Sequence, residues 1–287
     1  MATRHFVSFG AGSRSYRSAL RRLKTEVREL DSEARIWFYD DPKACESIDG
    51  LSIGLSAFAE RYPRGFGLWI WKPWIIWKVM SEAAYGDYVI YLDAGCTVHT
   101  SGASRNRYQF YLDYLNAMGT LHFRQNFLAS EWTKREVLRH FRFEPRDLRV
   151  GQIFAGIQGY LVNESSVAFV REWLSSCTLD DGRLLLDVSD RLEEDTQFIE
   201  HRHDQSILSC LVQQQGRPSI PDETFFHPNW NRDGDGFPFW ATRKRSGLPA
   251  WMGHYAPSGW PAALKSRISG KPLTRWLDPD FFPRSDT

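Results

Sequence analysis

The chain has 287 residues, of which 42% are hydrophobic and 25% are charged. This length suits one large α/β domain or two small ones, and the composition is that of a globular protein. The 36 Lys and Arg residues nearly balance the 35 Asp and Glu residues, so the net charge of +1 gives no general attraction to nucleic acid or to an anionic membrane. Aromatic residues form 15% of the chain, which suits a packed core and also a site whose flat rings stack on sugars.

The spacing of the cysteines and the length of the apolar stretches indicate in which cellular compartment the protein resides. Cys45, Cys96, Cys177 and Cys210 are far apart and form no CxxC pair, which argues against a zinc site or a disulfide scaffold. The N-terminal segment lacks the apolar core of a signal peptide. The most apolar stretch, Leu68–Met80, is interrupted by Lys72, Pro73 and Lys78 and is too short and too charged to span a bilayer. We therefore expect a cytoplasmic protein.

The first predicted elements form a βαβ unit. His5–Phe9 reads as a strand, and Tyr16–Leu30 follows as a helix with apolar residues at steps of three or four. Ala34–Tyr39 reads as a second strand. A strand, a helix and a strand within so short a segment predict a parallel sheet with a right-handed crossover.

Further helices and strands alternate along the chain. The patterns predict helices at Pro73–Ala84, Arg107–Met118, Ser165–Ser175 and Asp204–Gln214, and strands at Tyr88–Leu92 and Gln158–Val162. After Gly216 the sequence is rich in Pro, Gly and aromatic residues. We therefore expect a single domain over residues 1–287, with residues 217–287 as an irregular C-terminal cap.

An acidic residue follows the most apolar strand. In open α/β sheets, ligands bind beyond the carboxyl ends of the strands, and Asp93 lies there, directly after Tyr88–Leu92. A carboxylate at this point can bind a ribose hydroxyl or a divalent cation that bridges two phosphates; it can equally cap a turn. The small residues Ala94 and Gly95 would let a ligand approach the backbone. The same rule places a nucleotide near Ser8, Gly10 and Asp40.

Glycines and aromatic residues alternate before the helix predicted at Pro73. In the segment Gly65–Trp74, Lys72 stands at the helix start, where the helix dipole would help it to meet a phosphate. Trp69 and Trp71 offer flat rings to a saccharide acceptor. The alternative is an aromatic core strand followed by a solvated Lys.

Two segments that contain histidine are further candidates for the site. In the first, which includes His201 and His203, Asp204 begins a predicted helix, either as an N-cap or as a functional carboxylate. In both cases we expect Asp204→Asn to fold with a near-normal melting temperature. The neighbouring His201 and His203 are two residues apart and do not share a helix face, which disfavours a metal site. His254 lies in a late loop bracketed by Gly and Pro, where it suits a lid.

Taken in order, five of these segments resemble bacterial glycosyltransferases of the GT-A type. The resemblance covers most of the chain and is carried by RGFGLWIWKPWII, GDYVIYLDAG, FAGIQGYLV, RHDQSIL and GHYAPSGWP. It implies a GT-A-like (Rossmann-like) α/β fold, with a mostly parallel sheet flanked by helices.

The resemblance also implies roles for individual residues. Asp93 corresponds to the first acid of the DxD motif, which in that family holds the nucleotide-sugar diphosphate, usually through Mn²⁺ or Mg²⁺. Gly95 stands where the second acid is expected, so metal dependence stays open. His254 resembles a late residue that binds the metal or the diphosphate. Ala155-Gly156 resembles a turn that lines the sugar pocket, and Asp204-Gln205 resembles a catalytic pair beside the transferred sugar.

The activity implied by this resemblance is transfer of a hexose, with UDP-hexose as the expected donor, to a saccharide or glycolipid acceptor in surface polysaccharide synthesis. It favours a retaining reaction and a peripheral position, at the inner face of the membrane or on other enzymes of polysaccharide synthesis. Two other classes stay open. The segment Gly10–Arg14 partly matches the Gly-rich basic loop of a nucleotide-sugar pyrophosphorylase, and the tryptophans would suit a carbohydrate-binding module.

Overall fold

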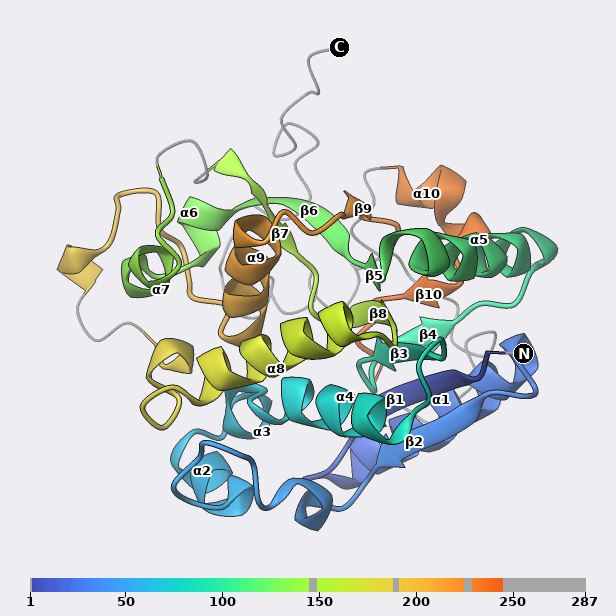
Figure 1. The fold of residues 1–287 in the computed structure, drawn as a ribbon, viewed down its shortest axis with the longest axis horizontal. Helices are drawn as coiled ribbons and strands as arrows, with labels where there is room; N and C mark the ends of the chain where they lie inside the picture. Colours follow the sequence, from blue (N-terminus) through green and yellow to red (C-terminus); the bar gives the residue numbers. More distant parts are fainter. Residues whose placement is uncertain (1, 145–148, 188–190, 225–228, 245–287) are drawn as a thin grey trace, which may run out of the picture. The chain divides into compact units, whose positions relative to one another are not determined.

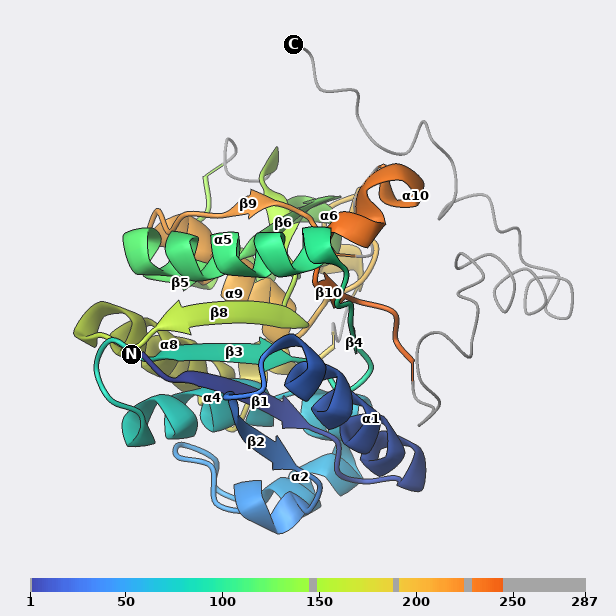
Figure 2. The ribbon, with the colours of Figure 1, turned by 90° about the vertical axis from the view of Figure 1, so that its right-hand side faces the viewer.

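The computed structural model describes residues 2–144, 149–187, 191–224 and 229–244. Its central sheet has five strands in the order β2-β1-β3-β8-β5. These strands are β1 (Arg4–Phe9), β2 (Arg35–Tyr39), β3 (Tyr88–Leu92), β5 (Thr120–Leu121) and β8 (Ile157–Leu161). β1 pairs in parallel with β2 and with β3, whereas β8 runs antiparallel to both β3 and β5. The sheet is thus mostly parallel, with β8 as the reversed strand (Figure 2).

The predicted βαβ start is confirmed. α1 (Arg14–Leu30) connects β1 to β2, and the Ser13 side chain caps it by accepting a hydrogen bond from the Tyr16 N–H. The apolar side of α1 packs on the sheet through Leu23 and Val27, which lie in one core with Phe6 of β1. The helix therefore covers one face of the sheet, as its periodicity predicts.

Helices cover both faces of the sheet. α1 and α5 (Gly102–Met118) pack against one face, while α4 (Trp71–Glu82) and α8 (Glu164–Thr178) lie side by side on the other (Figure 1). Alternate strand residues serve the two cores: Ile90 of β3 belongs to the first, whereas its neighbours Val89 and Tyr91 belong to the second. The mixed α/β fold class predicted from the sequence is therefore confirmed.

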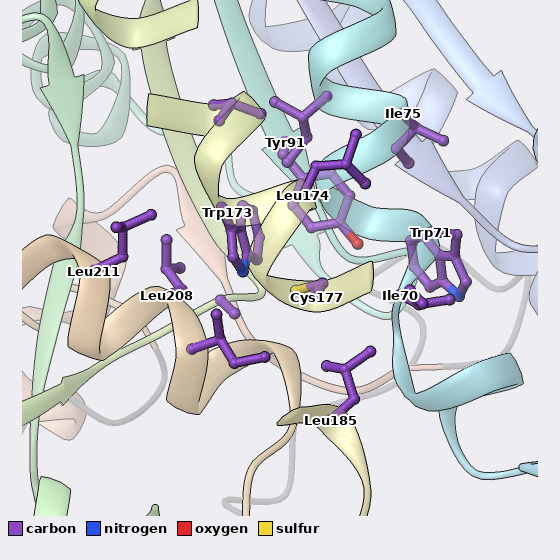
Figure 3. Packing of buried hydrophobic residues seen from close by; sticks show 14 of the residues in the cluster. Ile70, Trp71, Ile75, Tyr91, Trp173, Leu174, Cys177, Leu185, Leu208 and Leu211 are labelled. Atoms are coloured by element: carbon purple, nitrogen blue, oxygen red, sulfur yellow. The ribbon is translucent and has the colours of Figure 1, made fainter. Parts of the chain in front are cut away.

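The second core also includes α9 (Asp204–Gln214). Trp173 and Cys177 of α8, Tyr91 of β3 and Leu208 of α9 point toward one another in this core (Figure 3). The Trp173 indole N–H donates to the Asp204 carbonyl at 3.2 Å, which ties the start of α9 to the middle of the protein.

Short elements complete the described chain. β6 (Phe123–Leu128), β7 (Gly151–Ile153) and β9 (Ile220–Pro221) form a second sheet, and β4 (Thr97–Val98) pairs with β10 (Phe239–Trp240). The remaining short helices are η1 (Pro42–Cys45), α2 (Leu55–Arg61), α3 (Gly65–Leu68), α6 (Ala129–Trp132), α7 (Arg135–His140), η3 (Arg183–Leu185), η4 (Arg191–Glu193), α10 (Trp230–Asp233) and η5 (Gly234–Gly236). The predicted cap begins with such short elements, and its residues 245–287 lie outside the described part.

All four cysteines are free thiols, and all four are buried. Burial raises the pKa of Cys45 to about 12 and raises the pKa of Cys96, Cys177 and Cys210 as well. In the described part of the chain, none of the helices has the length and apolar character needed to cross a lipid bilayer.

Candidate functional site

A cavity of about 610 Å³ lies at the carboxyl ends of β1 and β3. Its size is that of small-molecule sites, and its position is where ligands bind to open α/β sheets. It is lined by residues from Phe9–Tyr16, Pro63–Lys72, Asp93–Cys96, Phe154–Gly156 and Arg202–Gln205, together with Ala241 and Arg243. These segments are far apart in the sequence, so the fold itself assembles the cavity.

Most of the site residues predicted from the sequence line this cavity. They are Gly10, Trp69, Trp71, Lys72, Asp93, Ala94, Gly95, Ala155, Gly156, Asp204 and Gln205. Ser8 does not reach the cavity, because its side chain is fully buried within β1. Asp40 is exposed after β2 and also lies outside the lining. His254 lies outside the described residues.

Lys72 joins two carboxylates at the bottom of the cavity. Its Nζ is 2.8 Å from Oδ2 of Asp204 and 3.5 Å from Oδ1 of Asp93. The side chains of Lys72 and Asp204 are 3% and 4% exposed, whereas that of Asp93 is 37% exposed. Of the two carboxylates, Asp93 is therefore the one that a ligand can reach directly.

Tyr91 supports this group from β3. Its hydroxyl donates to Oδ1 of Asp93 at 2.5 Å, and Nζ of Lys72 lies 5.4 Å from the centre of its ring. The ring face adds a cation–π contact to the ion pairs of the ammonium group. Tyr91 therefore orients Asp93 and stabilises the charged form of Lys72.

Burial and charge pull the pKa values of this group in opposite directions. Burial raises the pKa of Asp204 to about 6, although the positive charge of Lys72 opposes the rise. Burial lowers the pKa of Lys72, but the negative charges of Asp204 and Asp93 outweigh it, so this pKa lies above its ordinary value. Lys72 is therefore charged at neutral pH, and Asp204 titrates close to it.

The side chain of Asp204 is not a helix cap. The N-cap position of α9 belongs to His203, and no side chain makes a capping hydrogen bond there. Instead, the carboxylate of Asp204 lies against Lys72, which begins another helix. The structure thus shows a buried ion pair in place of a cap, and a functional role of Asp204 stays a prediction.

The Ala155-Gly156 turn holds Asp93 in place. The backbone N–H of Asp93 donates to the Gly156 carbonyl at 2.8 Å. A Cβ at Gly156 would lie 2.8 Å from Oδ2 of Asp93, so only glycine lets the carboxylate lie this close. The Ala155 N–H donates to Oε1 of Gln205 at 3.4 Å, which links this turn to α9.

Gln205 belongs to an amide network that the sequence patterns do not reveal. Its Nε2 donates to Oε1 of Gln125 on β6 and of Gln152 on β7, both at 3.3 Å. Gln205 thus holds the second sheet against the cavity, and its assignment to the transferred sugar stays a prediction.

The aromatic segment before α4 forms a left-handed turn instead of a strand. Five consecutive residues, Gly65–Trp69, have φ between 53° and 84°. Glycine adopts this conformation freely, but each of the other residues pays about 1–2 kcal/mol for it. The surrounding contacts must over-determine the turn, which is typical of functional sites.

This turn separates the two tryptophans that were predicted to bind the acceptor. Trp69 is half-buried and lines the cavity, with its ring 5.7 Å from that of His203. Trp71 is only 4% exposed; its ring stacks on Phe9 at 4.2 Å, and its indole N–H donates to the Gly65 carbonyl at 3.1 Å. Of the two, Trp69 is therefore the one whose ring is more accessible from the cavity, and acceptor binding by either stays a prediction.

The two buried histidines near Asp204 also have structural contacts. Nε2 of His201 lies 2.9 Å from the Leu184 carbonyl, and Nδ1 of His203 lies 2.7 Å from the Leu185 carbonyl. These contacts fix the segment that leads into α9. Within the described ranges, no group of three or more His, Cys, Asp or Glu side chains could hold a metal ion.

Three arginines of the lining stand out among the residues that the sequence patterns did not single out: Arg64, Arg202 and Arg243. Arg64 directly precedes the left-handed turn, and Arg202 lies two residues before Asp204. Both begin segments that carry the resemblance, RGFGLWIWKPWII and RHDQSIL, but no role was predicted for either arginine.

Comparisons with known proteins find similarity at the level of the backbone. No protein-family model matches the chain, and no curated protein matches its sequence significantly. A glycosyltransferase involved in the glycosylation of the major capsid of PBCV-1 is 10% identical, with 83% of this chain and 91% of that chain covered and a TM-score of 0.46. The galactosyltransferase LgtC, solved with donor and acceptor sugar analogs, is 14% identical, with 92% and 95% covered and a TM-score of 0.45. Mouse xyloside xylosyltransferase 1 is 12% identical, with 81% and 90% covered and a TM-score of 0.41. The three solved proteins are glycosyltransferases. The mixed α/β architecture that the sequence predicts is shown by the strand order and helix packing described above.

Proposed function

We propose that this protein transfers a sugar from a nucleoside diphosphate donor to a saccharide or glycolipid acceptor. The observation that carries the proposal is the convergence of Lys72, Asp93 and Asp204 at one cavity. These residues come from the start of α4, the end of β3 and the start of α9, and they meet where an α/β sheet binds its ligands.

The accessible carboxylate and the buried one suit different tasks. Asp93, held by the Tyr91 hydroxyl, is placed to accept a hydrogen bond from a hydroxyl of the donor. Asp204, with a pKa of about 6, suits proton transfer or charge stabilisation at the transferred sugar near neutral pH. The positive charge of Lys72 lowers the pKa of Asp204 and so favours its charged form.

The stereochemistry of the product distinguishes two uses of Asp204. An inverting reaction needs a base at the acceptor hydroxyl, whereas a retaining reaction needs a group that holds or attacks the donor sugar. The resemblance noted above favours retention. NMR of the anomeric proton in the first product identifies which reaction occurs.

UDP-hexose is the donor that we propose, and the test is a screen of nucleotide sugars. A bound donor raises the melting temperature as RT ln(1 + [L]/Kd), so one nucleotide family should stabilise the protein selectively. Incubation of that donor with saccharide acceptors should then yield an elongated glycan. Release of pyrophosphate instead would identify a pyrophosphorylase, an alternative favoured by the Gly10–Ser13 loop in the cavity wall. Glycan binding without turnover would identify a binding module.

A membrane-linked acceptor in surface polysaccharide synthesis is the finer proposal. It is supported by the outer face of α1, where basic residues recur at steps of three and four and all are exposed: Arg14, Arg17, Arg21, Lys24 and Arg28. Such a stripe attracts anionic lipid even though the whole chain is nearly neutral. Sedimentation with vesicles containing phosphatidylserine, compared with neutral vesicles, tests it; equal recovery with both would contradict the proposal.

A further inference from the structure

The position where the resemblance predicts a second metal-binding acid is closed by the chain itself. A Cβ at Gly95 would lie 3.0 Å from the Cα of Arg243, a backbone atom that cannot easily move away. The segment is fixed there by two hydrogen bonds to the Gly95 carbonyl, from the Lys244 N–H at 2.8 Å and from the Thr242 hydroxyl at 3.0 Å. A carboxylate side chain would fit here only if this hydrogen-bonded backbone moved by a few tenths of an ångström.

The space between the carboxylates of Asp93 and Asp204 is also occupied, in this case by Lys72. Nζ of Lys72 lies 2.8 Å from Asp204 and 3.5 Å from Asp93 and so provides the positive charge that a cation would bring. A divalent cation bound at the same carboxylates would meet an ammonium group at close range, which is strongly unfavourable. The described residues at this end of the cavity therefore do not fit a divalent cation.

Positive charge is supplied elsewhere in the lining. Arg64 and Arg202 both pair with the carboxylate of Glu200, Arg202 at 3.4 Å, so their guanidinium groups lie close together. Arg202 is held over the ring of Trp132 at 4.3 Å. Arg243 lines the same cavity beside Gly95.

The charges of these arginines act on one another. Burial lowers the pKa of Arg202; Glu200 opposes this shift, and the positive charges of Arg243 and Arg64 add to it. Two guanidinium groups thus share the Glu200 carboxylate, and the charge of Arg243 acts on one of them. The local excess of positive charge favours an anion with several oxygens. Guanidinium groups bind phosphate oxygens in a fixed bidentate geometry, which makes them suited to a diphosphate.

We propose that Arg64, Arg202 and Arg243 bind the diphosphate of the donor directly and that this binding needs no divalent cation. The inference rests on the proposed function, since it assigns the diphosphate subsite of that same cavity. It decides against a divalent cation, the need for which the sequence resemblance leaves open at Gly95.

The first experiment is calorimetric titration of the wild-type protein with inorganic pyrophosphate and with UDP, each in EDTA and again with added Mn²⁺. We expect both ligands to bind in EDTA, with dissociation constants that Mn²⁺ changes by less than about twofold. Binding that appears only with Mn²⁺ would overturn the inference and leave the proposed function intact. Pyrophosphate binding without binding of any nucleoside diphosphate would retain the anion site and contradict the proposed function.

The second experiment compares Arg202→Gln and Arg243→Gln with Arg171→Gln. Arg171 is an exposed residue of α8 outside the cavity and serves as the matched control. Loss of one charged hydrogen-bonding partner should weaken pyrophosphate binding in EDTA about tenfold to a hundredfold. The control should bind as the wild type does. Arg243 is itself exposed, so its variant should fold normally; unchanged pyrophosphate affinity in both cavity variants would refute the assignment.

Discussion

The ion pair between Lys72 and Asp204 makes a quantitative prediction about stability. Asp204→Asn keeps the size of the side chain but removes the charge 2.8 Å from a lysine that is only 3% exposed. Removing one partner of a buried ion pair costs about 3–5 kcal/mol. Because Asp93 still lies 3.5 Å from Nζ of Lys72, we expect the low end of that range, about 3 kcal/mol.

This loss is measurable as a melting temperature. For a unit of this size, 1 kcal/mol corresponds to about 2–4 °C, so Asp204→Asn should melt roughly 6–12 °C below the wild type. The sequence alone predicts a near-normal melting temperature for Asp204→Asn, as for a helix cap. The buried ion pair between Asp204 and Lys72 predicts a lower one. Turnover should fall at least about a hundredfold, the low end of general-base contributions.

A double-mutant cycle separates the pair from its surroundings. Lys72→Met leaves the Asp204 carboxylate buried without its closest cation, so this variant should also be destabilised. The double variant Lys72→Met/Asp204→Asn buries no charge at this point, and its loss should be smaller than the sum of the single losses by about 2 kcal/mol. Additive losses, or an Asp204→Asn variant that melts with the wild type, would refute the reasoning from burial.

Three further predictions concern pH, the Gly156 turn and the acceptor. Turnover should rise with pH through about 6 as Asp204 ionises. Because Lys72 lowers the pKa of Asp204, Lys72→Met should shift this rise to higher pH, and a pH–rate profile without that shift would contradict the assignment. Gly156→Ala places a methyl group 2.8 Å from Oδ2 of Asp93, so calorimetry should show weaker donor binding and a loss of about 1–3 kcal/mol in stability, whereas unchanged donor affinity would argue against a role for Asp93. Trp69→Leu should raise the KM for the acceptor about tenfold and leave the KM for the donor unchanged; equal effects on both would exclude the acceptor role.

Periodic patterns predicted the elements that frame the site. The strands around Phe6 and Ile90 follow from short runs of β-forming residues that are buried on both faces of the sheet. The helix of Leu23 follows from apolar residues at steps of three or four, which bury one face. α5 begins earlier than predicted, since Ser101 caps it by accepting from the Ser104 N–H at 3.1 Å. The short strands β4, β5, β7, β9 and β10 were missed, because two or three residues are too few to show a period.

The site was predictable only in part. Asp93 could be placed because it follows a strongly apolar strand, and the rule for strand ends then fixes its location. Its closeness to Lys72 and Asp204 is a tertiary property that no local pattern encodes. The left-handed turn was read as a possible core strand, because alternating aromatic residues suggest a pleat while the positive φ angles of Phe66 and Trp69 cannot be read from residue type.

The four buried thiols have a practical consequence for experiments on this protein. A thiol reacts as its thiolate, and burial raises the pKa of every cysteine here, so alkylating reagents should label the native chain very slowly. A single cysteine introduced at Ser15, which is exposed next to the cavity wall, would then carry a fluorophore almost exclusively. Such a reporter would follow ligand entry in the otherwise unmodified sequence, without first replacing any native cysteine.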